Sequence, residues 1–181
     1  MNLGAPEGDG EPGPAGRILE VVAHPGDPAR VGGHVEGGVV DGVVDDPGQR
    51  GHPAGDRHPQ PGLSAEVELL VTDADTAVAF RSGEVPVLAT PRVVSLCEEA
   101  SVAALVGRLE PGSTTVGHTV QLDHVAPTRV GTSVRAEATL LKVNGRRLTF
   151  SVAVSDARGL VAAGKITRVI VDAERFLEKA H

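Results

Sequence analysis

Residues 89–105 of the 181-residue chain read Ala-Thr-Pro-Arg-Val-Val-Ser-Leu-Cys-Glu-Glu-Ala-Ser-Val-Ala-Ala-Leu, and this stretch predicts a long helix. Thr90 followed by Pro91 is typical of a helix start, because the hydroxyl can cap a free amide and proline at the first helical position loses no hydrogen bond. Apolar residues then recur at helical spacing. We expect the helix to run from Pro91 to about Leu109, where Pro111-Gly112 ends it.

One side of this expected helix is apolar and built largely from small residues. At about 100° per residue, six apolar residues fall in one wide sector. They are Val93, Leu96, Cys97, Ala100, Ala103 and Ala104. Small side chains in that sector would let a curved sheet approach the helix closely.

Five strand-like stretches accompany the helix, one before it and four after it. They are rich in β-branched residues and cover Ala65–Thr72, Thr114–Val125, Thr132–Val143, Arg147–Val154 and Leu160–Val171. Asn144-Gly145 favours a two-residue hairpin, because both positions can take a positive φ. Asp172 is expected to cap a short C-terminal helix.

One long helix against one antiparallel sheet is a two-layer α+β domain. A long central helix wrapped by a curved antiparallel sheet of about five strands is the hotdog fold, and we place it at residues 63–181. Such a half-barrel pairs through an edge strand, which also covers the exposed edge of the sheet. We therefore expect a homodimer.

Residues 1–62 have a different texture. They are dense in glycine and proline, hold no Phe or Lys, and show no sustained helical or strand period. Such a segment cannot bury enough apolar surface to offset the entropy of ordering its backbone. We expect a disordered leader, or a translated upstream region outside the working protein. Its histidines are scattered among breaker residues and are not expected to bind a metal.

Charge and cysteine content exclude several classes of function. The leader carries four arginines against ten acidic residues, so it accounts for most of the formal net charge of −7, and the remainder is close to neutral. No basic field is present to attract nucleic acid or an anionic membrane. The single cysteine, Cys97, excludes an intrachain disulfide and fits a reducing compartment. With no secretory signal or bilayer-spanning segment in the sequence, we expect a cytoplasmic protein.

Glu98 is the first candidate for chemistry. Its sector of the helix also holds Val94, Leu105 and Leu109, and an ionised carboxylate among apolar residues is costly without a partner. A helix-edge acid that reaches water or pairs with an arginine is the simpler interpretation, and a general base is the functional one. The neighbouring Glu99 falls in the sector of Arg92 and Ser95, as a solvated surface acid would.

His124 is the second candidate. Alternation along its strand puts it on the same face as Val120 and Leu122, the face expected to meet the helix. A histidine there is either a hydrogen-bonded core residue or a group that transfers protons. His118 is expected on the same face and is the competing candidate, nearer the start of the strand.

Three runs of sequence together resemble the fluoroacetyl-CoA thioesterase family of hotdog proteins. They are Val-Leu-Ala-Thr-Pro-Arg-Val-Val-Ser-Leu-Cys-Glu at 87–98, Val-Gln-Leu-Asp-His-Val-Ala-Pro-Thr-Arg-Val-Gly at 120–131, and Gly-Arg-Arg-Leu-Thr-Phe at 145–150. The resemblance covers about residues 63–176 and leaves the leader unmatched.

The resemblance implies a catalytic set of Thr90, Glu98 and His124. It further implies that the backbone of Gly117 contacts the substrate and that Arg168 lies near the pocket. The fluoroacetyl-specific enzyme carries phenylalanines just before its Ala-Thr-Pro, whereas residues 81–88 of this chain hold no aromatic residue. The resemblance to the fluoroacetyl-specific enzyme therefore does not extend to the part that encloses the small acyl group.

The implied activity is hydrolysis of an acyl-CoA, or of another acyl thioester, to a carboxylate and a free thiol. CoA is expected as part of the substrate, and no metal or redox cofactor is expected. A hotdog protein that binds or senses acyl-CoA without turnover is the alternative from another class. A hydratase of enoyl thioesters is a further one, although its usual Asp and His pattern is not found.

Overall fold

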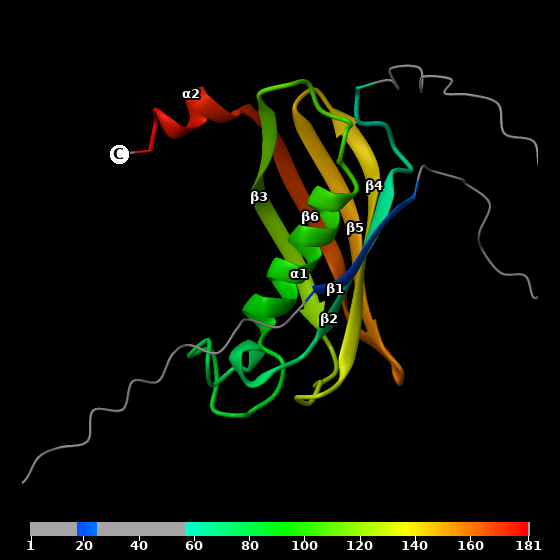
Figure 1. Cartoon of the computed structure of the whole chain (residues 1–181), viewed down its shortest axis with the longest axis vertical. Helices are drawn as coiled ribbons and strands as arrows, with labels where there is room; N and C mark the ends of the chain where they lie inside the picture. Colours follow the sequence, from blue (N-terminus) through cyan, green and yellow to red (C-terminus); the bar gives the residue numbers. More distant parts are fainter. Residues whose placement is uncertain (1–17, 25–56, 181) are drawn as a thin grey trace, which may run out of the picture.

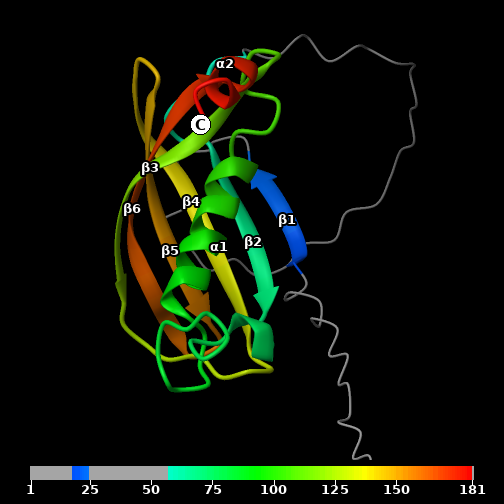
Figure 2. The same cartoon turned by 90° about the vertical axis from the view of Figure 1, so that its left-hand side faces the viewer.

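The computed structural model describes residues 18–24 and 57–180, whose strands form one antiparallel sheet in the order β1-β2-β4-β5-β6-β3. The sheet curves around the long helix α1, which lies on its concave side (Figure 1 and Figure 2). This is the predicted two-layer α+β arrangement. The elements are β1 (Ile18–His24), β2 (Ser64–Leu70), the 3-10 helix η1 (Asp73–Asp75), α1 (Thr90–Ala103), β3 (Ser113–His124), β4 (Ser133–Asn144), β5 (Arg147–Asp156), β6 (Gly159–Asp172) and α2 (Ala173–Leu177).

The five predicted strands are confirmed to within two residues at each end. The hairpin between β4 and β5 turns at Asn144 and Gly145, and Gly145 has a φ of 57°, which glycine adopts without strain. The Asp172 side chain accepts a hydrogen bond of 2.9 Å from the Arg175 amide, so it caps α2 as predicted. Local turn and cap chemistry thus sets the order of the strands and the end of the domain.

Strand β1 was not expected, because it belongs to the segment interpreted as a leader without strands. Ile18–His24 pairs antiparallel with β2 and adds a sixth strand to one edge of the sheet. The sequence Ile-Leu-Glu-Val-Val-Ala-His is a local strand signal, and the surrounding glycines and prolines hide it when the segment is judged as a whole. The rest of the predicted leader up to residue 56, with His34 and His52, lies outside the described residues.

Helix α1 is shorter than predicted. It ends at Ala103 rather than near Leu109, and the amides of Leu105 and Val106 then bond three residues back, which tightens the last turn. Gly107 follows with a φ of 72° and takes the chain out of the helical direction. Among the residues that the structure describes, no helix is long and apolar enough to cross a membrane.

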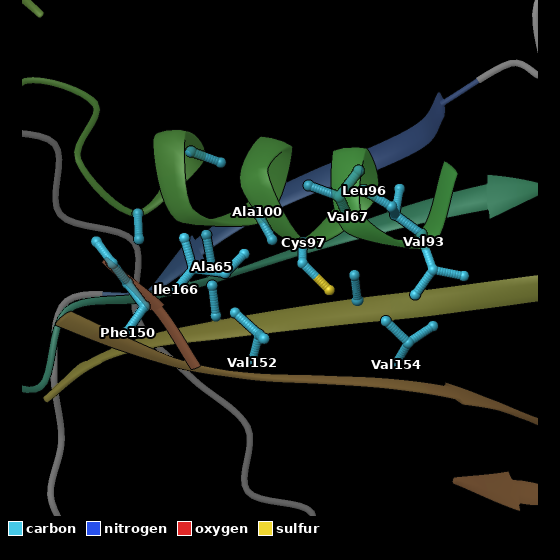
Figure 3. Packing of buried hydrophobic residues seen from close by; sticks show 14 of the residues in the cluster. Ala65, Val67, Val93, Leu96, Cys97, Ala100, Phe150, Val152, Val154 and Ile166 are labelled. Atoms are coloured by element: carbon cyan, nitrogen blue, oxygen red, sulfur yellow. The ribbon is translucent and has the colours of Figure 1, made fainter. Parts of the chain in front are cut away.

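The core lies between α1 and the concave face of the sheet (Figure 3). All six residues of the predicted apolar sector of the helix are buried. Cys97 and Ala100 point toward the sheet, where Val152 on β5 and Val67 on β2 are among the facing side chains. Small residues on the helix therefore bring it close to the sheet, as predicted, and fix which side of α1 is left for other contacts.

The Cys97 thiol is expected to be unreactive in the folded protein. It is fully buried, and this burial, with a smaller contribution from the charge of Glu98, raises the pKa of the thiol to about 12. Because the thiolate is the reacting form, a colorimetric thiol reagent at pH 8 should detect no cysteine in the native protein and one in guanidinium chloride. Rapid labelling of the native protein would contradict this packing.

Candidate active site

Thr90 and His124 form a hydrogen-bonded pair where the start of α1 meets the end of β3. Thr90 Oγ1 lies 2.9 Å from His124 Nδ1, and the imidazole tautomer decides which of the two donates. The other ring nitrogen of His124, Nε2, is buried and has no partner within residues 57–180. A buried polar atom without a partner is costly, so Nε2 is the ring atom left for a ligand.

The cap role expected of Thr90 is not observed. Helix α1 begins at Thr90 itself, Ala89 occupies the N-cap position, and no side chain caps this end. Because the Thr90 hydroxyl is not used on a helix amide, it is available to His124. The amides of the first turn are likewise left without a side-chain cap and can interact with a developing negative charge.

A cavity of about 310 Å³ opens beside this pair. Thr90 and His124 both line it, and the loop before α1 and the loop after β3 form its other walls. These walls consist of small or apolar residues, none of them aromatic: Ala77, Ser82, Val87, Leu88, Val125, Ala126 and Pro127. The cavity can therefore hold a small or medium apolar group next to His124 Nε2.

Glu98 and Arg168 form a second pair, further along α1. Arg168 Nη1 donates to Glu98 Oε1 at 2.9 Å. The Arg168 side chain is 7% exposed and the Glu98 side chain is 34% exposed. Arg168 also donates from Nε to Thr115 Oγ1 and from Nη2 to the Thr115 carbonyl, each at 3.0 Å. Burial lowers the pKa of the Arg168 guanidinium, and the charge of Glu98 works against that shift.

Both interpretations of Glu98, an acid paired with an arginine and a general base, fit this geometry. The carboxylate pairs with an arginine and is also partly open to solvent. Its Oε1 is held by Arg168, whereas Oε2 accepts no hydrogen bond from the residues described. Glu98 is thus a fixed carboxylate with one oxygen available for chemistry.

Gly117 lies on β3 directly against this carboxylate. A Cβ atom at this position would collide with Glu98 Oε1. Gly117 is also the register partner of Arg168 on β6. A residue without a side chain is therefore needed here for the acid to reach the strand backbone.

His118, the competing candidate, does not lie with either pair. The register between β3 and β6 passes from Gly117 to Thr119, so His118 is the extra residue of a β-bulge. It is exposed, and its Nδ1 lies 2.8 Å from Thr119 Oγ1. The bulge shifts the alternation by one residue, so the simple alternation that placed His118 on the face of His124 does not hold across it.

Glu99 is not the solvated acid that its position predicted. It accepts hydrogen bonds from Arg92 at 2.7 Å and from Ser95 at 3.1 Å. Arg92 is buried and also donates to the buried carboxylate of Asp75 at 3.0 Å. The three residues predicted to share one sector of the helix thus form, together with Asp75, a network of hydrogen bonds and ion pairs that joins η1 to α1.

Within one chain the two pairs stay apart. Thr90 and Glu98 are eight residues apart on α1, which corresponds to about 12 Å along the helix axis. His124 and Gly117 are separated by roughly 20 Å of extended strand. Thr90, Glu98 and His124, predicted as one set, therefore belong to two separate side-chain pairs within one chain.

Thr115 is a contact of the candidate site that the sequence analysis did not predict. It is buried and holds two of the three nitrogens of Arg168, although 53 residues separate them in the chain. A usable signal did exist: Thr115 stands two residues before Gly117, so both point to the same face of the strand. Only the pairing of β3 with β6 shows what that face meets.

Comparisons with known proteins give a consistent assignment. The family of the fluoroacetyl-CoA-specific thioesterase FlK matches residues 71–174. The fluoroacetyl-CoA thioesterase of Streptantibioticus cattleyicolor is 36% identical over 93 residues, which make up 51% of this chain and 67% of that protein.

Solved structures agree with the sequence match. A mutant of the fluoroacetyl-CoA-specific thioesterase FlK in complex with fluoroacetate and CoA superposes with a TM-score of 0.62 at 28% identity, over 65% of this chain and 99% of that chain. A hot-dog-like protein from Thermanaerovibrio acidaminovorans gives a TM-score of 0.63 at 26% identity, over 68% of this chain and 91% of that one.

The fold and its relatives define a hotdog protein of the thioesterase class. More narrowly, the chain belongs to the family of the fluoroacetyl-CoA-specific thioesterase. The family, the hotdog fold and the thioesterase class predicted from the sequence are thereby confirmed. The roles of Thr90, Glu98, His124, Gly117 and Arg168 remain predictions.

Proposed function

We propose that this protein hydrolyses an acyl-CoA to a carboxylate and free CoA, with Thr90, Glu98 and His124 as its catalytic residues. The observation that carries the proposal is the Thr90–His124 hydrogen bond at the rim of a cavity, with Nε2 buried and unpartnered. The Glu98 carboxylate held by Arg168 supplies the second half of the chemistry.

In the proposed reaction a carbon–oxygen bond forms at the thioester carbonyl and the carbon–sulfur bond breaks. Glu98 Oε2 either removes a proton from the attacking water or attacks the carbonyl itself to form a transient anhydride that water then opens. His124 Nε2 donates a hydrogen bond to the carbonyl or transfers a proton to the leaving thiolate, while Thr90 orients the ring. The first-turn amides of α1 favour the developing negative charge. The reaction calls for no metal or redox cofactor.

A relative was solved with fluoroacetate and CoA bound, which supports a CoA thioester as the substrate class. The acyl group is proposed to occupy the cavity beside His124. Because the walls of that cavity carry no aromatic side chain to close over a two-carbon group, a somewhat larger acyl group fits better than fluoroacetyl. The buried single cysteine accords with a cytoplasmic location.

A homodimer is part of the proposal, because it would join the two side-chain pairs. Among the described strands, β3 forms one edge of the sheet and pairs only with β6. Two-fold pairing of two β3 edges is antiparallel, so the first half of one strand lies beside the second half of the other. Glu98 and Gly117 of one protomer then approach the pair formed by the partner's Thr90 and the partner's His124.

Mixing two inactive variants tests this composite site. Glu98→Gln and His124→Asn should each be inactive as homodimers. After subunit exchange at equal amounts, half of the dimers are mixed and each holds one intact site, so about a quarter of the parent activity should return. No recovery, with exchange demonstrated by mass spectrometry, would contradict a site built from two protomers.

Thr90→Val is expected to lower activity and leave stability unchanged. Valine keeps the shape of threonine and removes the hydroxyl that binds His124. Because that hydroxyl caps no amide, the loss of about 1 kcal/mol that follows removal of an N-cap should not appear. Thr90→Ser, which keeps the hydroxyl, is the matched control. A lower Tm with unchanged turnover in Thr90→Val would instead indicate that Thr90 acts as a helix cap.

Thiol release from a panel of acyl-CoAs tests the activity itself. The full chain is assayed with acetyl, fluoroacetyl, medium-chain and aromatic acyl groups, and the buried Cys97 contributes no background. Turnover with at least one of them, strongest for an acyl group larger than fluoroacetyl, is the expected result. A protein that binds the panel and releases no thiol is instead an acyl-CoA binding protein.

A further inference from the structure

A second hollow adjoins the cavity at Thr90 and His124. It has a volume of about 690 Å³, and Val87 and Pro127 line both spaces, so the two lie side by side. Two arginines, Arg129 and Arg158, also line this outer hollow. They come from the loop before β4 and from the turn between β5 and β6, so distant parts of the chain converge here.

The two guanidinium groups differ in how they are held. Arg158 donates from Nε and Nη2 to Asp156 at 3.2 and 2.9 Å, and Nη2 also donates to the Pro127 carbonyl at 2.9 Å. These bonds fix the side chain over the hollow and leave Nη1 free of any described partner. Arg129 is exposed and has no side-chain hydrogen bond or ion pair within residues 57–180.

The balance of charge at this place leaves room for an anion. Asp156 offsets part of the charge of Arg158, and that arginine in turn lowers the pKa of the Asp156 carboxyl. Asp73 is the one acidic residue that lines the hollow, and it is exposed. The two arginines outnumber the single acid in the lining, and no ion pair joins Arg129 to Asp73 within the described residues.

We propose that this outer hollow binds the phosphate groups of the thioester's carrier, with Arg129 and Arg158 as the binding residues. The proposal rests on the proposed function, since it takes the acyl group to lie in the adjoining cavity. Guanidinium groups bind phosphate through two parallel hydrogen bonds. An open hollow beyond the reacting end, lined by two arginines, suits a multiply charged phosphate group, whereas an acyl chain gains little there.

The phosphate that the arginines bind is one of two groups. It is either the phosphate attached to pantetheine, which CoA shares with acyl carrier proteins, or the 3′-phosphate that CoA alone carries. Kinetics with acyl-CoA, acyl-dephospho-CoA, acyl-phosphopantetheine and acyl-pantetheine, all with the same acyl group, separate these sources. Arg129→Gln is the main variant, because the Arg129 side chain is exposed and makes no hydrogen bond or ion pair within the described residues. Arg147→Gln, an exposed arginine at the opposite end of the sheet, is the control.

Arg129→Gln and Arg158→Gln are each expected to raise KM for acyl-CoA about tenfold, with kcat unchanged and with acyl-pantetheine unaffected. If the rise in KM also appears with acyl-phosphopantetheine, the arginines bind the phosphate attached to pantetheine. If the rise in KM appears with acyl-CoA and not with acyl-dephospho-CoA, the arginines bind the 3′-phosphate. Equal losses on acyl-CoA and acyl-pantetheine, or no loss at all, would overturn the proposal.

Binding of free CoA by calorimetry keeps this result separate from the proposed hydrolysis. If no thioester is turned over and CoA still binds more weakly to Arg129→Gln, the phosphate site stands and the thioesterase proposal fails. If turnover is normal and CoA binds equally to the parent and to both arginine variants, the phosphate site fails and the thioesterase proposal stands.

Discussion

Glu98→Gln is expected to lower kcat for the best acyl-CoA by about 10²–10⁴-fold, the usual range for loss of a general base. The substitution removes the negative charge and the basicity of Oε2 and keeps the size of the side chain. Thiol release under saturating substrate measures it. The KM should change little, because Glu98 is proposed to act at the reacting bond and not to bind the carrier.

The fold is expected to survive this change, for a reason visible around Arg168. Removing the partner of a buried cation can cost several kcal/mol, but the amide oxygen of glutamine can still accept the hydrogen bond that Arg168 Nη1 donates at 2.9 Å. Glu99→Gln is the matched control, since the next acid on α1 binds Arg92 and faces away from this pair. Equal losses in both variants would point to a general effect of charge on the helix.

A single turnover in ¹⁸O-labelled water separates the two roles left open for Glu98. If Glu98 activates water, the first carboxylate released carries one labelled oxygen. If Glu98 attacks and water then opens the anhydride at the glutamyl carbon, the first product carries no label, because its new oxygen comes from the side chain. The label then remains in the Glu98 carboxylate.

The sequence predicts the layers of this domain well because local patterns determine them. The helical spacing of Val93, Leu96 and Cys97 and the alternation in the strands each report one buried face. The Asn144-Gly145 turn and the Asp172 cap then punctuate those elements. None of these features needs a partner that is distant in the chain.

The site is predicted less completely, since it depends on contacts between distant segments. Composition alone hides β1, and a helix-start pattern makes Thr90 look like a cap when its hydroxyl binds His124. One bulge residue, His118, is enough to change which side chains share a face. The position of Thr115 two residues before Gly117 indicates a shared strand face, but only the pairing of β3 with β6 brings Arg168 to that face.

The separation of Thr90 from Glu98 bears on function as much as on prediction. Two groups about 12 Å apart along one helix cannot both touch one carbonyl carbon. If Thr90, Glu98 and His124 act together as proposed, a single chain does not assemble them at one carbonyl. Dimer formation through β3 would make activity depend on protein concentration below the dissociation constant of the dimer.

His124→Asn is expected to reduce kcat by about 10²–10⁴-fold, as for loss of a group that transfers a proton. An asparagine amide can take the place of Nδ1 and keep the hydrogen bond to Thr90, so the variant removes little more than Nε2. That atom is buried and has no partner among the described residues. Thiol release gives the rate, and an unchanged Tm shows that the Thr90 side of the site is intact. Near-parental turnover would exclude His124 from the chemistry.

His124→Gln separates the two roles proposed for Nε2. The longer amide reaches the position of Nε2 and gives up the bond to Thr90, so it can donate a hydrogen bond to a carbonyl but cannot transfer a proton at neutral pH. If His124 only polarises the thioester carbonyl, the kcat of His124→Gln should be at least tenfold higher than that of His124→Asn. If it protonates the leaving thiolate, both variants should be equally slow with alkyl thioesters. Thioesters of acidic thiols, which leave without a proton, should then restore the rate of both.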